Sequence, residues 1–244
     1  MPERPRSEHR THKRVIGLLA QPIGAGGLGY RYLGDWRDRA NNRPVEAEVL
    51  RDSLKARGYS DAQISAAMQR LETAVDSTGI TLYQANLRTY QLLRYGAQVQ
   101  TSPSAAHETV HLIDWEHPER NDFAVAEEVT LRGGHERRPD IVVYVNGIAV
   151  AVLELKRGSV DLADGIRQLI TNQEEIFNKG FFSTVQLVLA GNDSQGLRYG
   201  TVTTREEFFV EWKSSAADVA TVGARLDNPL RELLDKERFL DLVR

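Results

Sequence analysis

The chain has 244 residues and a formal net charge of −3, from 31 Lys and Arg against 34 Asp and Glu. This length can bury a substantial core as one domain, and the net charge argues against a protein that coats DNA generally. No cysteine is present, which excludes disulfides and thiolate metal sites, and no apolar run reaches membrane-spanning length. With no apolar signal core after the basic N-terminus, we expect a cytoplasmic protein.

Residues 1–80 predict an N-terminal helical part. Residues 1–14 are rich in basic side chains and are expected to be mobile, with 15–20 ending a first helix. Two more helices are predicted at 44–57 and 60–75, and the second begins with a capping-box pattern at Ser60 and Gln63.

Gly24–Gly29 in the same part spells GxGxxG. A dinucleotide site needs a strand before this motif and a long helix after it. Pro22 precedes it and another glycine, Gly34, follows soon after, so we interpret the segment as a connector.

Residues 81–215 predict a mixed sheet flanked by helices. Helices are expected at 83–95 and 161–177, and strands at 97–101, 108–114, 123–131, 139–145, 148–156, 183–190 and 197–202. A third segment, 216–244, is expected to close the chain with an amphipathic helix at 228–243. The predicted fold class is therefore α/β (α+β).

An HExxH string at His107–His111, with His117 six residues on, has the spacing of a zinc protease. That mechanism needs both histidines on one helical face. The Thr and Val content around Val110 predicts a strand instead, and Asp114 stands where the zinc-protease turn requires glycine. We therefore do not expect a zinc site.

The most informative stretch is a hairpin, 139–156, in which two β-branched runs flank Asn146-Gly147. Its open end carries Asp140, Glu154 and Lys156. Because side chains alternate along a strand, Glu154 and Lys156 share a face, but a plain two-residue turn would put Asp140 on the other one. We therefore predict a three-residue connection with a bulge at Gly147, or strong bending near Asp140, with Asp140 paired to Val152.

Carboxylates at the end of an apolar ribbon need a partner, and a divalent metal would be one. Mg²⁺ takes hard oxygen ligands, so Asp140, Glu154 and the Leu155 carbonyl are candidate metal ligands. Lys156 can hold an attacking water or neutralise charge on a phosphate. Structural roles for the same residues, a strand-end ion pair and a turn, remain open at this point.

The spacing Asp-x13-Glu-x-Lys resembles the PD-(D/E)xK nuclease superfamily. Longer blocks resemble the amino-terminal endonuclease region of the R subunit of type I restriction-modification enzymes: LYQANLRTYQLLRYG (82–96), VHLIDWEHPERNDFAVAEEVTL (110–131), RRPDIVVYVNGIAVAVLELKR (137–157), GIRQLITNQ (165–173) and FFSTVQLVLAGNDSQGLRYGT (181–201). The resemblance implies a restriction-endonuclease-like mixed sheet, with Asp140, Glu154 and Lys156 as the catalytic set and Mg²⁺ as the cofactor.

The same family carries a Gln-x-x-x-Tyr motif on the helix after the lysine. Gln168 falls at the matching place and is carried over as a site residue, whereas the tyrosine position is Asn172, which we interpret as an ordinary solvated residue. The family also implies an ATP-driven motor beyond this chain, double-stranded DNA as substrate, and methyltransferase (M) and specificity (S) subunits as partners.

Other residues near the hairpin have weaker assignments. Arg137, Arg138 and Arg157 are candidate DNA contacts. Glu8 is a candidate early acid by position only, and Asn192, Asp193 and Arg198 fit either a DNA groove or a polar turn. Two alternative functions stay open: a repair or junction-resolving nuclease of the same superfamily, and a non-catalytic docking module.

Overall fold

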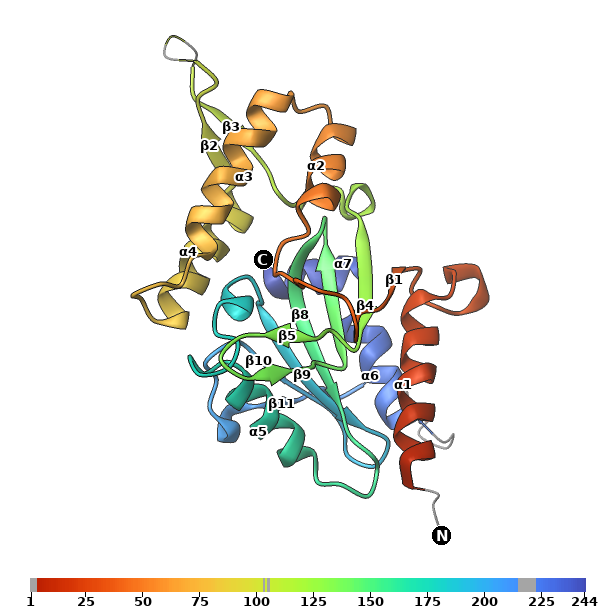
Figure 1. Cartoon of the computed structure of the whole chain (residues 1–244). Helices are drawn as coiled ribbons and strands as arrows, with labels where there is room; N and C mark the ends of the chain where they lie inside the picture. The colour runs from red at the N-terminus through yellow and green to blue at the C-terminus, as the bar shows by residue number, and fades with distance from the viewer. Residues whose placement is uncertain (1–3, 103, 105, 215–222) are drawn as a thin grey trace.

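Seven strands form one mixed sheet at the centre of the molecule, in the order β1-β4-β7-β8-β9-β10-β11 (Figure 1). The computed structural model describes residues 4–102, 104, 106–214 and 223–244, with side chains from residue 9 onward. Pairing is parallel between β1 and β4 and between β8 and β9, and antiparallel elsewhere. The strands are β1 (Arg31–Asp35), β4 (Phe123–Glu127), β7 (Ile141–Val145), β8 (Ile148–Leu155), β9 (Leu187–Asn192), β10 (Gly196–Gly200) and β11 (Val210–Glu211).

Helices flank the sheet, which confirms the predicted fold class (Figure 1). One face packs against α1 (Arg4–Ala20), α6 (Ala224–Leu233) and α7 (Lys236–Val243), and the other against α5 (Leu162–Asn172). At one end stand α2 (Ala47–Ala56), α3 (Asp61–Val75) and α4 (Leu82–Tyr95), with the hairpin of β2 (Ala97–Val99) and β3 (Glu108–Val110). The remaining short elements are β5 (Leu131–Arg132), β6 (Glu136–Arg137) and the 3-10 helices Ile23–Ala25, Pro118–Arg120, Phe181–Ser183 and Glu206–Phe208.

Every residue of β7 and β8 is buried. Alternate side chains enter two different cores: Ile141 and Val143 pack on the α1 side, whereas Val142 and Tyr144 pack on the α5 side. A strand that is covered on both faces reads as a continuous apolar run, which is why this hairpin stands out in the sequence. The charged residues at its end are therefore held by a rigid central element.

The two ends of the chain correct the sequence predictions. Residues 4–14, expected to be mobile, belong to α1, because Arg14 forms ion pairs with Asp193 and Asp227 and so ties this helix to the body. Residues 1–3 lie outside the described part. The single closing helix predicted at 228–243 is two helices, since the Asp235 side chain caps the start of α7.

The N-terminal segment also contributes a strand that was not predicted. β1 pairs with β4 at the edge of the main sheet, so the first 80 residues are not purely helical. The capping box of Ser60 and Gln63 is confirmed. Gly24–Gly29 begins within the 3-10 helix Ile23–Ala25 and leads to β1, and the two histidines of the HExxH string flank β3, so neither motif opens or occupies an α-helix.

The turn of the central hairpin differs from the prediction. Val145 pairs with Ile148, so the connection has two residues, Asn146 and Gly147, with φ of 52° and 78°. These positive φ values fit a type I′ turn. The bulge predicted at Gly147 is therefore wrong, but another bulge lies within β8: the register shifts between Val143 and Tyr144, which leaves one extra residue on β8. The extra residue brings Asp140 to the same face of the hairpin as Glu154, as the proposed site requires.

Asn146 also anchors the hairpin to its surroundings. Its buried side chain donates to Leu112 O (2.9 Å) and Asn121 Oδ1 (2.8 Å) and accepts from Asp122 N (2.7 Å). These bonds tie the turn to the segment before β4.

We expect Asn146→Ala to lower the free energy of unfolding by about 3 kcal/mol, from lost buried hydrogen bonds and a strained left-handed alanine. Asn146→Gly tolerates the backbone conformation and should be destabilised by about 2 kcal/mol. Denaturant unfolding of both variants measures this order. Equal stability of Asn146→Ala and the parent would contradict it.

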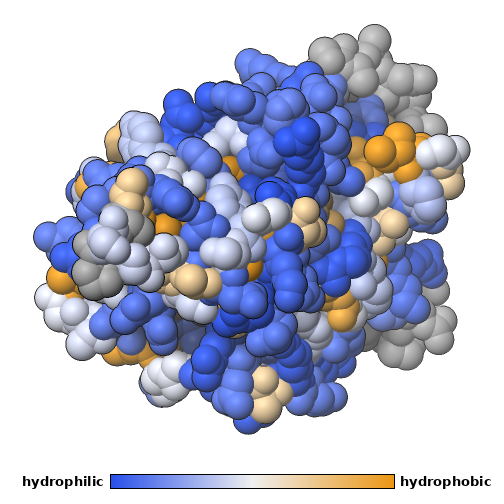
Figure 2. All heavy atoms as spheres, turned by 90° about the horizontal axis from the view of Figure 1, so that it is seen from above, coloured by the Kyte–Doolittle hydropathy of each residue, from blue (hydrophilic) through white to orange (hydrophobic). Residues whose placement is uncertain are grey.

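Seen from above in Figure 2, the molecule presents a mainly hydrophilic surface with small, separated hydrophobic spots. Across the described ranges, none of the helices combines the length and apolar character needed to cross a membrane.

Candidate active site

Asp140 lies directly before β7, and the bulge in β8 sets what it faces. Ile141 pairs with Leu153, so extending this register by one residue places Asp140 opposite Glu154. The predicted pairing with Val152 is wrong, because Val152 pairs with Val142. Asp140 Oδ2 accepts a hydrogen bond of 2.6 Å from Leu155 N. Since the N–H and C=O of one strand residue point to the same neighbouring strand, the Leu155 carbonyl is directed to the Asp140 side.

Lys156 completes the cluster from the α5 face of the sheet. Its Nζ lies 2.8 Å from Glu154 Oε1 and donates to Gln168 Oε1 at 2.6 Å. The helix approaches closely here, since a Cβ on Gly165 would lie 3.2 Å from Lys156 Cγ. The four residues singled out in the sequence therefore come together: Asp140, Glu154, Lys156 and Gln168.

The carboxylates of Asp140 and Glu154 are close together and partly buried, so it is unfavourable for both to be ionised. The Glu154 side chain is only 2% exposed. Burial, and secondly repulsion from Glu154, raises the pKa of Asp140 to about 8, although the Leu155 amide, His12 and Lys156 lower it. A divalent cation beside both carboxylates would relieve this cost, because it favours their ionised forms.

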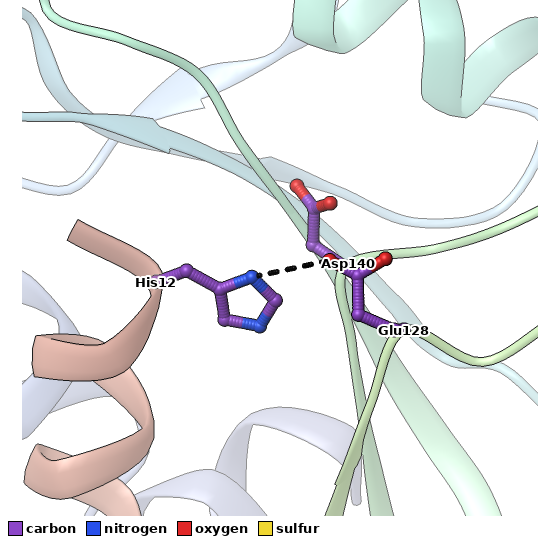
Figure 3. A group of neighbouring side chains, drawn as sticks. All are labelled: His12, Glu128 and Asp140. Carbon is purple, nitrogen blue, oxygen red and sulfur yellow. Dashed lines mark ion pairs between the residues drawn. The ribbon is translucent and has the colours of Figure 1, made fainter. Parts of the chain in front are cut away.

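A further group of possible ligands was not predicted. His12 on α1, Glu128 just after β4 and Asp140 have ligand atoms that all lie within 4.8 Å of one another. Figure 3 shows the His12 ring directed from α1 toward the segments that carry the two carboxylates. His12 Nδ1 is 3.6 Å from Glu128 Oε1, and Nε2 is 3.1 Å from Glu127 Oε2. These donors fit a metal ion.

A sequence signal for His12 existed. It lies three and seven residues before Val15 and Leu19, which are fully buried, so it shares their helical face. This pattern was not used, because residues 1–14 were expected to be mobile. Glu128 has no such signal, because its φ of 53° breaks the strand pattern in which it was expected.

The candidate DNA-contacting arginines are placed differently from one another. Arg138 Nε lies 2.5 Å from Glu128 Oε2, at the site. Arg137 stacks on Phe177, with its guanidinium carbon 3.9 Å from the ring centroid, and Arg157 is half-buried beside Lys156.

Asn192 and Asp193 have structural partners. Asn192 donates to Val160 O (2.9 Å), and Asp193 pairs with Arg14 and accepts from Thr11. These contacts favour the polar-turn interpretation for both. Arg198 lies on β10.

Asn172 corrects the prediction of a solvated residue. It is fully buried, because it continues the α5 stripe of Leu162, Ile166 and Leu169, and neither its amide N nor its amide O has a hydrogen-bond partner among the described residues. The backbone of Glu8 lies in α1, and its side chain lies outside the described residues.

Known proteins resemble this chain over most of its length. The family described as type I restriction enzyme R protein N terminus matches residues 15–208. The endonuclease subunit of the type I restriction enzyme HindI, from Haemophilus influenzae, is 31% identical over 93% of this chain and 23% of its own length. The putative MjaIXP endonuclease subunit of Methanocaldococcus jannaschii is 26% identical (57% of this chain, 14% of its own), and the EcoprrI subunit of Escherichia coli 25% (44% and 36%). The chain thus spans well under half the length of these curated relatives.

Proposed function

The chain belongs to the family of type I restriction enzyme R protein N-terminal regions, and on this premise we propose that it is a Mg²⁺-dependent endonuclease domain that hydrolyses phosphodiester bonds of DNA. The observation that carries the proposal is the convergence of Asp140, Glu154 and Lys156 at the end of one rigid hairpin. The endonuclease names of the relatives support it.

Asp140, Glu154 and the Leu155 carbonyl would hold the ion, with His12 and Glu128 adjacent to Asp140. Hard oxygen donors in a partly desolvated place suit Mg²⁺. When bound, the ion would polarise the phosphoryl oxygen and lower the pKa of a bound water. The raised pKa of Asp140 supports this role, since the residue carries its charge readily only beside a cation.

Lys156 would bring a positive charge to the scissile phosphate. Glu154 and Gln168 fix its ammonium group from two sides, so its orientation is set before substrate arrives. In this proposal, Lys156 donates to the attacking water or to a phosphate oxygen. Gln168 is a positioning residue that acts through Lys156.

The wider context is also proposed. The relatives' greater length supports a parent protein in which residues 216–244 lead from the nuclease core, 81–215, toward an ATP-driven motor. Double-stranded DNA would be the substrate, M and S subunits the partners, and the cytoplasm the location. Sequence specificity would come from the partners, so this chain would hold mainly backbone contacts with DNA.

Metal removal tests the proposal. The chain, alone and within its full-length parent assembled with M and S subunits, is incubated with supercoiled plasmid and ATP in Mg²⁺, and in EDTA. We expect nicked product in Mg²⁺ and none in EDTA. Nicking that persists in EDTA would contradict the metal mechanism, and no nicking in either form of the protein would favour a docking module.

A further inference from the structure

Glu128 has an unusual position beside the metal-binding candidates. It follows β4 directly with a φ of 53°, and its N–H donates to the carbonyl of Asp140 at 2.8 Å. A left-handed backbone is uncommon for glutamate and is held only where the surroundings fix it. Its side chain is 16% exposed, so the carboxylate faces inward to neighbouring groups.

The two oxygens of this carboxylate serve different neighbours. Oε2 lies 2.5 Å from Arg138 Nε, while Oε1 lies 3.5 Å from Arg37 Nη2 and 3.6 Å from His12 Nδ1. The same residue offers an oxygen to the group formed with His12 and Asp140 (Figure 3). One carboxylate thus stands between two guanidinium groups and a place for a divalent cation.

The two arginines are suited to DNA phosphates. The Arg138 and Arg37 side chains are about half exposed, and Arg138 lies two residues before Asp140. A guanidinium that is held by a carboxylate offers fewer donors to a phosphate than a released one. A divalent cation attracts a carboxylate more strongly than a partly exposed arginine does, because it carries twice the charge.

We propose that Glu128 couples metal binding to DNA binding. Without a divalent cation its carboxylate retains Arg138 and Arg37. When a cation is bound at Asp140, beside His12 and Glu128, the Glu128 carboxylate turns to the cation and both arginines are released to DNA phosphates. This inference rests on the proposed nuclease function, and it makes Glu128 a positioning residue for the substrate backbone.

The consequence is a measurable thermodynamic linkage. If a cation changes the affinity of the protein for DNA by some factor, DNA changes the affinity for the cation by the same factor. Each phosphate contact made by a released arginine adds about 0.9 to the slope of log affinity against log salt concentration. Two released arginines would therefore steepen the salt dependence by about 1 to 2.

The test measures the affinity of the chain for a fluorescent 30-base-pair duplex over a KCl series, in EDTA and in Ca²⁺, which binds oxygen ligands as Mg²⁺ does. We expect Ca²⁺ to tighten binding by the wild type and to steepen its salt slope. Glu128→Gln should bind DNA in EDTA about 3- to 10-fold more tightly than the wild type, with the steeper slope already present and a smaller gain from Ca²⁺.

Glu127→Gln is the matched control. It removes the same charge from the adjacent position, where the carboxylate contacts His12 and Tyr32. It should therefore leave the binding in EDTA unchanged. If Glu127→Gln and Glu128→Gln tighten binding equally, general charge explains the effect and the inference is overturned.

A second variant does not depend on Glu128 tolerating substitution. Arg138→Gln should lower the slope of log affinity against log salt concentration by about 0.9 in Ca²⁺, which corresponds to one phosphate contact, and leave this slope unchanged in EDTA. An equal loss in both conditions would overturn the inference. Nicking of plasmid in Mg²⁺ is measured on the same wild-type preparation. A wild type that nicks without this coupling refutes the inference alone, whereas one that neither nicks nor binds DNA refutes the proposed function as well.

Discussion

Replacing Asp140 or Lys156 by alanine is expected to lower Mg²⁺-dependent nicking by about 10³-fold or more. Asp140→Ala removes the carboxylate that faces Glu154 and that forms the group of possible metal ligands with His12 and Glu128. Lys156→Ala removes the ammonium group held 2.8 Å from Glu154 Oε1. Initial rates of plasmid nicking over a range of Mg²⁺ concentrations measure both effects.

The two variants should differ in how they respond to metal. Excess Mg²⁺ should restore part of the activity lost in Asp140→Ala if the loss is one of metal affinity, but none of that lost in Lys156→Ala. Asp52→Asn, which changes an exposed residue on α2, serves as the control and should nick like the parent. Either alanine variant nicking at the parental rate would remove that residue from the catalytic set.

Gln168→Ala extends the same comparison. Because Gln168 acts only through its 2.6 Å bond to Lys156, we expect a loss of about 10- to 100-fold. Combined with Lys156→Ala it should add little, since the group that it positions is already gone. Additive losses would contradict a positioning role.

The central hairpin was the easiest part of the molecule to predict. Its apolar residues are buried on both faces, so two continuous apolar runs predict the strands, and the Asn146-Gly147 pair between them predicts the turn. A metal site required Asp140 and Glu154 to share one face of the hairpin, which needs a bulge, but the local sequence does not indicate where a bulge forms. The bulge lies within β8, opposite the step from Val143 to Tyr144 on β7, rather than at Gly147.

The residues that sequence reasoning missed owe their positions to tertiary contacts. His12 reaches the site because α1 is tied down by Arg14, which pairs with Asp193 and Asp227 from distant segments. Glu128 points to the site because its backbone leaves the strand conformation and bonds to Asp140. The helical pattern of α1 indicates that His12 is on the buried face, but no pattern within α1 or β4 indicates which distant residues these segments contact.

Asp140→Asn is expected to stabilise the folded chain at alkaline pH while abolishing nicking. Burial and the proximity of Glu154 raise the pKa of Asp140 from 3.8 to about 8 in the folded state. Between these values the folded state binds a proton that the unfolded state does not, so the contribution of Asp140 to stability is complete below about pH 4 and is lost as pH rises through about 8. Asparagine keeps a similar shape and an oxygen to accept from Leu155 N, but it never carries the charge.

The measurement is the thermal midpoint of parent and variant from pH 5 to pH 9 in EDTA. We expect the stability advantage of Asp140→Asn to grow by about 4 kcal/mol between pH 5 and pH 9, or roughly 8–16 °C. Asp52→Asn should show no such growing gap. Mg²⁺ should narrow the gap by stabilising the parent alone, because the ion binds the ionised carboxylate that the variant lacks. A gap that is independent of pH and of Mg²⁺ would mean that Asp140 carries no buried charge for a cation to neutralise. A gap that follows both would identify the site as one where stability is given up for metal binding.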